Sequence, residues 1–278
     1  MAPRSLTWAT ELDSLGMDSR VERREGYLLV RSPQRPEHWW GNLLLFEHAP
    51  RSGDAERWER LFEAEFAHEP RVAHRTFAWD TTDGELGAAL EEFPPRGYDL
   101  DRLVGLIATV PEVRAHPRAN REVIVRRLDP RPGADAEPWE EVLEISVAGR
   151  DERIDEHDHR AHRRARLQEM RAIFRARGGG WYVALDPATQ AVLAGCGLIL
   201  AGGRASIHDV DTIPSQRRKG ICSRLLVEAV AHLAGERAPA HVVIAADPDY
   251  HALGLYESLG FRPREHCAGV CRMPPREG

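Results

Sequence analysis

The pattern of apolar and polar positions is clearest between residues 119 and 278. Alternating runs and apolar stripes at helical spacing follow one another there, and glycine or proline separates most of them. The expected elements are, in chain order, a strand at 122–128, helices at 139–145 and 151–177, strands at 181–185, 192–200 and 205–213, a helix at about 220–234, a strand at 241–246, a helix at 250–259 and a strand ending near Met273. This order predicts an α/β (α+β) fold with a mixed, mostly antiparallel central sheet and helices on both faces.

The first part of the chain contains a shorter version of the same order. At an offset of about 163 residues, the matching positions are Ala89-Leu90 on Ala252-Leu253, Phe93 on Tyr256, Gly97-Tyr98 on Gly260-Phe261 and, with one residue of slippage, Pro50 on Pro214. Both prolines end an apolar strand and precede an amphipathic helix, and the first copy is expected to lack the two early helices. We therefore expect two tandem domains, over residues 1–118 and 119–278.

Composition and charge exclude several classes of protein. The net charge of −6 argues against a nucleic-acid partner. The longest uncharged apolar run, residues 192–203, is too short to span a bilayer, and the N-terminus lacks the apolar core of a secretory signal. The four cysteines include no CxxC pair, so we expect them to be reduced, in a cytoplasmic protein without a membrane partner.

The segment 214–222 has the features of an anion site between a strand and a helix. A helix N-terminus presents unpaired N–H groups, and Gly220 allows the backbone to approach a phosphate closely. Arg217, Arg218 and Lys219, the only lysine of the chain, add positive charge. A glycine at a helix start in an arginine-rich chain can also have a purely structural role.

With the residues downstream of this loop, the sequence resembles the GNAT superfamily of N-acetyltransferases. The resemblance rests on the motifs Arg217-x-x-Gly220-x-Cys222, Asp249-x-x-Ala252 and Leu255-Tyr256-x-x-Leu259-Gly260-Phe261, and it covers about residues 122–278. Two positions depart from the family pattern, because Cys222 replaces a glycine or alanine and Asp249 replaces an asparagine. The resemblance implies a GNAT fold for the second copy, and with the internal repeat we expect two tandem GNAT-like domains.

The resemblance also implies that acetyl-CoA, as co-substrate, lies between the fourth and fifth strands of the second copy. Loop amides would hold its pyrophosphate, and the backbone of the fourth strand would pair with its pantetheine. The implied cofactor-binding residues are Val210, Thr212, Arg217, Arg218, Lys219, Gly220, Ile221, Cys222 and Asp249. Tyr256 would take the position of the general acid that protonates the leaving CoA thiolate; the alternative is a buried aromatic side chain with a satisfied hydroxyl.

The fourth strand also contains the candidates for the general base. By two-residue alternation Asp209 and Asp211 share one face and His208 lies on the other. Either aspartate could accept the proton of an amine acceptor, or bind a cationic acceptor instead. The segment 157–162 carries three histidines, of which only the last two have a spacing that could chelate a metal. We expect no metal site there, but a solvated charged helix that could act as a mobile lid.

The first copy differs at these positions. In the repeat alignment residues 53–58 stand where the second copy has 217–222, so carboxylates replace a cationic position and the glycine, and Trp58 stands at Cys222. Phe93 replaces Tyr256. We therefore interpret the first copy as a degenerate domain without a cofactor site.

Together these observations predict an N-acetyltransferase that transfers an acetyl group directly to a small-molecule amine in a ternary complex. The chain would be a monomer or a homodimer. The alternatives are a non-catalytic acyl-CoA-binding or protein-interaction module, and a transferase that uses a longer acyl-CoA.

Overall fold

The computed structural model describes residues 3–234, 238–249 and 251–274, and the chain divides into two compact units. Unit 1 comprises residues 1–105, 245–250 and 263–278, and unit 2 comprises residues 106–244 and 251–262. These units do not follow the expected boundary at residue 118. The last strand, β11 (Arg262–Arg272), lies almost wholly in unit 1, where it pairs with β4 (Arg75–Trp79). An alternating strand can satisfy its hydrogen bonds at any free sheet edge, so its sequence does not tell which unit it joins.

Unit 1 is a sheet between two helices. Its strand order is β1-β2-β3-β4-β11-β5, in which β3 and β4 pair in parallel. Its elements are α1 (Leu6–Asp13), β1 (Arg20–Arg24), β2 (Tyr27–Arg31), η1 (Trp39–Gly41), β3 (Leu43–Phe46), α2 (Asp54–Phe66), β4, η2 (Leu90–Glu92), η3 (Pro94–Arg96) and most of β5 (Asp99–Ala108) and β11. The helix α1 was not expected in the first copy.

The two faces of this sheet carry separate apolar clusters. Leu44 and Phe46 of β3 pack with Trp58 of α2, whereas Leu43 and Leu45 pack on the side of α1. This alternation is what a strand buried on both faces requires. Helices therefore cover both faces of unit 1, as predicted for the fold.

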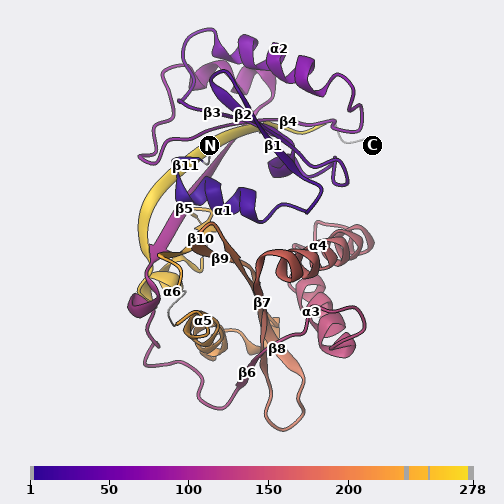
Figure 1. The fold of residues 1–278 in the computed structure, drawn as a ribbon, viewed down its shortest axis with the longest axis vertical. Helices are drawn as coiled ribbons and strands as arrows, with labels where there is room; N and C mark the ends of the chain where they lie inside the picture. The colour runs from indigo at the N-terminus through magenta and orange to yellow at the C-terminus, as the bar shows by residue number, and fades with distance from the viewer. Residues whose placement is uncertain (1–2, 235–237, 250, 275–278) are drawn as a thin grey trace. The chain divides into compact units, whose positions relative to one another are not determined.

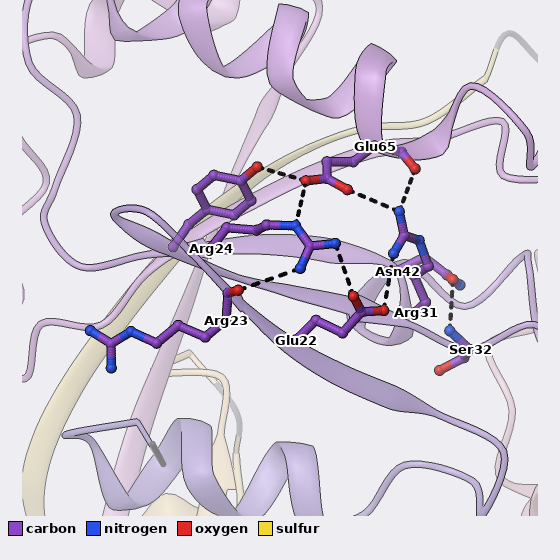
Figure 2. Close-up of polar contacts among 8 residues, drawn as sticks. Glu22, Arg23, Arg24, Arg31, Ser32, Asn42 and Glu65 are labelled. Atoms are coloured by element: carbon purple, nitrogen blue, oxygen red, sulfur yellow. Dashed lines mark hydrogen bonds and ion pairs between the residues drawn. The ribbon is translucent and has the colours of Figure 1, made fainter.

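Polar contacts fix both helices of unit 1. The carboxylate of Glu65 on α2 accepts hydrogen bonds from Tyr27, Arg24 and Arg31 of the β1–β2 hairpin (Figure 2). The start of α1 is held by buried Glu265 of β11, which accepts four hydrogen bonds of 2.7–3.0 Å from Ser5, Leu6 and Thr7.

Unit 2 has the strand order β10-β9-β8-β7-β6, with antiparallel neighbours except for the parallel pair β9 and β10. Its elements are η4 (Val110–Glu112), β6 (Ile124–Arg127), α3 (Ala136–Ala148), α4 (Glu156–Arg177), β7 (Gly179–Leu185), β8 (Val192–Ala201), β9 (Arg204–Thr212), η5 (Pro214–Gln216), α5 (Ile221–Ala231), most of β10 (His241–Ala246) and α6 (Leu253–Ser258). Residue 250, where the last helix was expected to begin, lies outside the described residues. The expected order of elements in this part of the chain is confirmed.

Helices cover both faces of the sheet of unit 2 (Figure 1). On one face Trp181 and Val183 of β7 pack with apolar residues of α3 and α4. On the other face Tyr182 contacts His232 at the end of α5, with 5.2 Å between ring centroids. The predicted fold class, a mixed and mostly antiparallel sheet with helices on both faces, is confirmed.

At the segment 214–222, called the anion loop below, the two copies align in a different register from the one expected. The helices α2 and α5 both follow a glycine in the left-handed conformation, Gly53 at φ 81° and Gly220 at φ 74°. Gly53 therefore corresponds to Gly220 rather than to Arg217, and Trp58 corresponds to Leu225 rather than to Cys222. The alignment was wrong by three residues, because the identities that anchored it lie outside this loop.

Candidate active site

The fourth strand of the second copy, β9, leaves part of one edge open. Its parallel register with β10 joins only Arg204–Ser206 to His241–Val243, while β9 itself continues to Thr212. Among the described residues of unit 2, no strand pairs with this edge of β9 beyond Ser206. An extended ligand could therefore form backbone hydrogen bonds along it.

A β-bulge interrupts β9 in the open stretch. Gly197 of β8 pairs with His208 and Gly195 pairs with Asp211, so Asp209 and Val210 together face one residue of β8. Asp209 has a φ of 52°, in the left-handed region. Bulges of this kind redirect side chains and are frequent beside active sites.

The orientation of the backbone after the bulge follows from one hydrogen bond. The N–H of Ile213 donates to the carbonyl of Leu193 in β8, so position 213 is turned toward β8. By alternation, the backbone groups of Thr212 and Val210 are turned toward the open edge. Arg217 Nε donates to the Thr212 carbonyl at 3.2 Å, so this carbonyl already has a partner.

One arginine of α4 bridges the two candidate bases. Arg163 Nη1 lies 2.5 Å from Asp209 Oδ1, and its Nη2 lies 3.3 Å from Asp211 Oδ2. Arg166 Nε lies 3.3 Å from Asp209 Oδ2. The structure thus brings Asp209 and Asp211 together, as predicted, but on a shared cation that the sequence analysis did not identify.

The two carboxyl groups differ in their proton affinity. Burial disfavours the ionised form of Asp209, but Arg163 and Arg166 outweigh it and hold the pKa of Asp209 below its ordinary value. For Asp211 burial has the larger effect and raises its pKa. Burial also lowers the pKa of His208 to about 4, so its imidazole is neutral at pH 7. Of the three groups, Asp211 is the one whose pKa is shifted upward, and it is therefore the best suited to act as a proton acceptor.

The helix α5 begins just after β9 and presents free donors. Arg218 and Gly220 both adopt left-handed conformations, at φ 64° and 74°. The backbone amides of residues 218–223 have no acceptor among the described residues. Together with the positive end of the helix dipole, these amides can hold an anion such as a pyrophosphate. Arg217, Arg218 and Lys219 are exposed on the same loop, and Lys219 Nζ donates to Gln216 at 2.7 Å.

Gly220 has a second role, which is packing. A Cβ atom at this position would lie 2.1 Å from the carbonyl oxygen of Arg118 and 2.8 Å from the amide nitrogen of Asn120. The N–H of Asn120 donates to the Gly220 carbonyl at 3.0 Å, and its side-chain amide donates to the carbonyl of Lys219. Residues 118–120 of the same unit therefore pack against the anion loop and hold it by hydrogen bonds.

The other predicted residues have different environments. Tyr256 is buried in α6 at 4% exposure. Burial raises the pKa of Cys222 to about 12, so its thiol stays neutral. Asp249 belongs to unit 1 and its N–H donates to Asp247, whereas the anion loop belongs to unit 2.

Within α4, four of the six residues 157–162 are exposed, as expected for a solvated segment, but two arginines that follow are not. Arg163 and Arg166 are each only 13% exposed, and His159 is half-buried with a lowered pKa that follows first from burial and then from Arg163. The signal was present in the sequence, because Arg163 lies four residues before Leu167 and seven before Met170 on the apolar stripe. No group of three or more potential metal ligands is found in the part of the chain that the structure describes.

The corresponding place in unit 1 has a different geometry. There β3 and β4 are paired up to Phe46 and Trp79, and the N–H of Asp80 extends the ladder to the carbonyl of Phe46. Phe46 stacks on Trp58 with ring centroids 3.8 Å apart. At the start of α2 the carboxylate of Asp54 accepts a hydrogen bond from the N–H of Arg51.

Comparisons with known proteins concern the family and the fold of this chain. Residues 139–261 match the sequence model of the acetyltransferase (GNAT) family. A search of curated proteins found no match. No helix among the described residues is long and apolar enough to cross a membrane.

Several solved structures share the fold over nearly the whole chain. A GCN5-related N-acetyltransferase from Kribbella flavida is 15% identical, with a TM-score of 0.64 and 99% of this chain and 97% of that chain covered. A tandem GNAT protein from the clavulanic acid biosynthesis pathway is 13% identical, with a TM-score of 0.59 and coverage of 100% and 92%. A functionally unknown protein from Staphylococcus epidermidis is 12% identical, with a TM-score of 0.73 and coverage of 93% and 95%. The chain has the fold of tandem GNAT proteins, and it contains a GNAT-family acetyltransferase domain that includes the open edge of β9 and the start of α5.

Proposed function

We propose that unit 2 transfers an acetyl group from acetyl-CoA to a small-molecule amine by direct attack in a ternary complex. The observation that carries the proposal is the open edge of β9, which leads directly to the free amides at the start of α5. Acyltransferase chemistry is supported by the family match over this segment.

The residues of unit 2 fit the two ends of such a co-substrate. The amides of residues 218–223 would hold the pyrophosphate, with Arg217, Arg218 and Lys219 adding charge. The backbone N–H of Val210 and the open edge around Thr212 would pair with the pantetheine arm. A donor at Val210 also suits stabilisation of negative charge on the thioester oxygen.

The reaction forms a bond between the amine nitrogen and the acyl carbon and breaks the bond from that carbon to sulfur. In our proposal Asp211 accepts the proton that the amine loses, and Tyr256 protonates the departing thiolate. Asp209 is less suited to the role of base, because two arginines stabilise its ionised form.

We also propose that unit 1 holds no acetyl-CoA. The paired ends of β3 and β4 and the stack of Phe46 on Trp58 leave no open strand edge at the corresponding place. The carboxylate of Asp54 at the start of α2 would repel a pyrophosphate.

The first test is a calorimetric titration of acetyl-CoA into the wild type and into a variant that carries Arg218→Glu and Lys219→Glu. Both side chains are exposed, so the variant is expected to fold. We expect one site per chain in the wild type and at least about tenfold weaker binding in the variant. Arg51→Glu is the matched control, because Arg51 precedes Gly53 in unit 1 as Arg218 precedes Gly220, and its affinity should equal that of the wild type. Two sites per chain, or equal affinities of all three proteins, would contradict the proposal.

Turnover separates an enzyme from a non-catalytic acyl-CoA-binding module. Thiol release is measured with a panel of amines, and acetyl-CoA is compared with butyryl-CoA and longer donors. We expect Asp211→Asn to retain acetyl-CoA binding and to lose about 100-fold or more in turnover. Binding without turnover for every amine and donor would favour the module.

A further inference from the structure

Building on the proposed function, we infer that Arg163 is a positioning residue that holds the β9 bulge in its productive shape. A single guanidinium contacts the carboxylates on both sides of Val210, whose N–H, by strand alternation from Ile213, is turned to the open edge. Asp209 is then the anchor of the bulge, and Asp211 is the group that remains free to exchange a proton.

The bulge needs an anchor for a physical reason. Asp209 has a left-handed backbone, a conformation that is strained for a residue with a side chain. Short polar side chains tolerate this conformation when they have partners, and here Asp209 has Arg163 at 2.5 Å and Arg166 at 3.3 Å. Without these partners the strand could relax toward regular pairing with β8. Val210 would then turn away from the open edge, since a shift of one residue inverts the direction of every group.

The geometry of Arg163 suits this role better than that of a surface ion pair. Its side chain is 13% exposed, and its planar fork reaches Asp209 with Nη1 and Asp211 with Nη2. By contrast, the neighbouring Arg164 is 49% exposed and pairs with Glu140 of α3. Removal of Arg163 would leave Asp209 half-paired and buried, whereas removal of Arg164 would leave Glu140 in water.

Asp211 is also surrounded by groups from other elements, which any pH experiment has to consider. The titratable, charged and hydrogen-bonding groups that face it from α3, α4, β9, the anion loop and α5 are Ser146, His159, Arg163, Asp209, Arg217 and Cys222. Of these, Arg163 has the largest favourable effect on its carboxylate.

The experiment compares the wild type with Arg163→Gln, Arg163→Lys and the control Arg164→Gln. Two readouts are used: the pH profile of acetyl transfer, with kcat and KM separated, and amide hydrogen exchange of peptides covering residues 207–213 in the unliganded protein. The second readout needs no turnover, so it tests the position of the bulge even where the proposed function fails.

For Arg163→Gln we expect faster exchange over 207–213 and a kcat that stays about 10–100-fold low even at the alkaline plateau, with the KM for acetyl-CoA changed by less than about threefold. The acid limb of the pH profile of kcat should move to higher pH, because the variant lacks the Arg163 cation that stabilises the Asp211 carboxylate. Arg163→Lys restores the charge but not the fork, so the limb should return toward its wild-type position while the plateau stays low. Arg164→Gln should match the wild type in both readouts.

Two results would overturn the inference. Exchange over 207–213 that is the same in Arg163→Gln and Arg164→Gln means that Arg163 does not hold the bulge. If kcat of Arg163→Gln reaches the wild-type value at alkaline pH, Arg163 acts only on the proton affinity of Asp211. A wild type that binds acetyl-CoA without any turnover would instead refute the proposed function, and the exchange result would still decide the role of Arg163.

Discussion

Gly220 and Gly53 form a matched pair for measuring what a glycine contributes at the start of these helices. Both have a left-handed backbone, so Gly→Ala costs each about 1 kcal/mol. A Cβ atom on Gly53 meets nothing within 4 Å, but one on Gly220 lies 2.1 Å from the Arg118 carbonyl oxygen. The segment at 118–120 would have to retreat by about 1 Å, which adds about 1–3 kcal/mol for overpacking and about 1 kcal/mol for the lost bond from Asn120. We therefore expect a loss of about 3–5 kcal/mol for Gly220→Ala and about 1 kcal/mol for Gly53→Ala.

Urea unfolding of both variants measures the difference, and hydrogen exchange of peptides around residues 114–120 locates it. Faster exchange there is expected only for Gly220→Ala. Equal losses of stability in the two variants would refute the packing argument. If Gly220→Ala were as stable as Gly53→Ala but bound acetyl-CoA weakly, the glycine would serve the approach of the ligand alone. For the same reason, a bulky substitution of Gly220 is a poor test of the cofactor site, because it would damage the loop whether or not a ligand binds.

Three further outcomes follow from buried polar groups. Glu265→Gln should lower the free energy of unfolding by about 2–3 kcal/mol in urea titrations, since an amide cannot accept all four hydrogen bonds from the start of α1. The control Glu47→Gln, at an exposed ion pair, should change the free energy of unfolding by less than about 0.5 kcal/mol. The pKa of His208 is about 4 in the folded protein and near 6.5 when unfolded, so the unfolded state binds the proton first and stability should fall by up to about 3 kcal/mol as pH drops from 6.5 to 4; in His208→Gln this part of the pH dependence should be missing from the same titrations. Because burial raises the pKa of Cys222 to about 12, mass spectrometry should find its alkylation by iodoacetamide at pH 8 at least about 100-fold slower than that of a free thiol, and rapid labelling of the folded protein would contradict its burial.

The order of elements in unit 2 was predictable because each element has its own local periodicity of apolar residues. The helix α4 carries an apolar stripe through Leu167 and Met170, and the uninterrupted apolar run at 241–246 gave β10. The place of β11 in unit 1 was not predictable, since the choice between free strand edges depends on partners far away in the sequence.

The site was only partly predictable for a related reason. Motif spacing identified the loop at 217–222, and alternation placed Asp209 beside Asp211. Alternation could not indicate the bulge, because Asp209-Val210-Asp211 alternates polar and apolar side chains as a regular strand does. Arg163 was not singled out in the sequence because it follows a segment expected to be solvated, although its position on the apolar stripe of α4 turns it inward. Where charge and periodicity disagree, the position on the stripe decided the direction of the side chain.

In our proposal, the absence of an acetyl-CoA site from unit 1 does not depend on one residue. The corrected register aligns Ala55 with Cys222, so at that position the first copy has the small side chain that a phosphate loop favours. The two copies differ in the strand pair next to the helix. In unit 1, β3 and β4 are paired up to their last residues, and Phe46 stacked on Trp58 occupies the space that a pantetheine arm would need. Because each fully buried aromatic side chain contributes several kcal/mol, opening this edge would cost more than a few favourable contacts to a ligand could return. We therefore expect that replacing Asp54 at the helix start leaves the stoichiometry of acetyl-CoA at one per chain, because in our proposal the strand edge, and not the charge of the loop, determines which copy can bind.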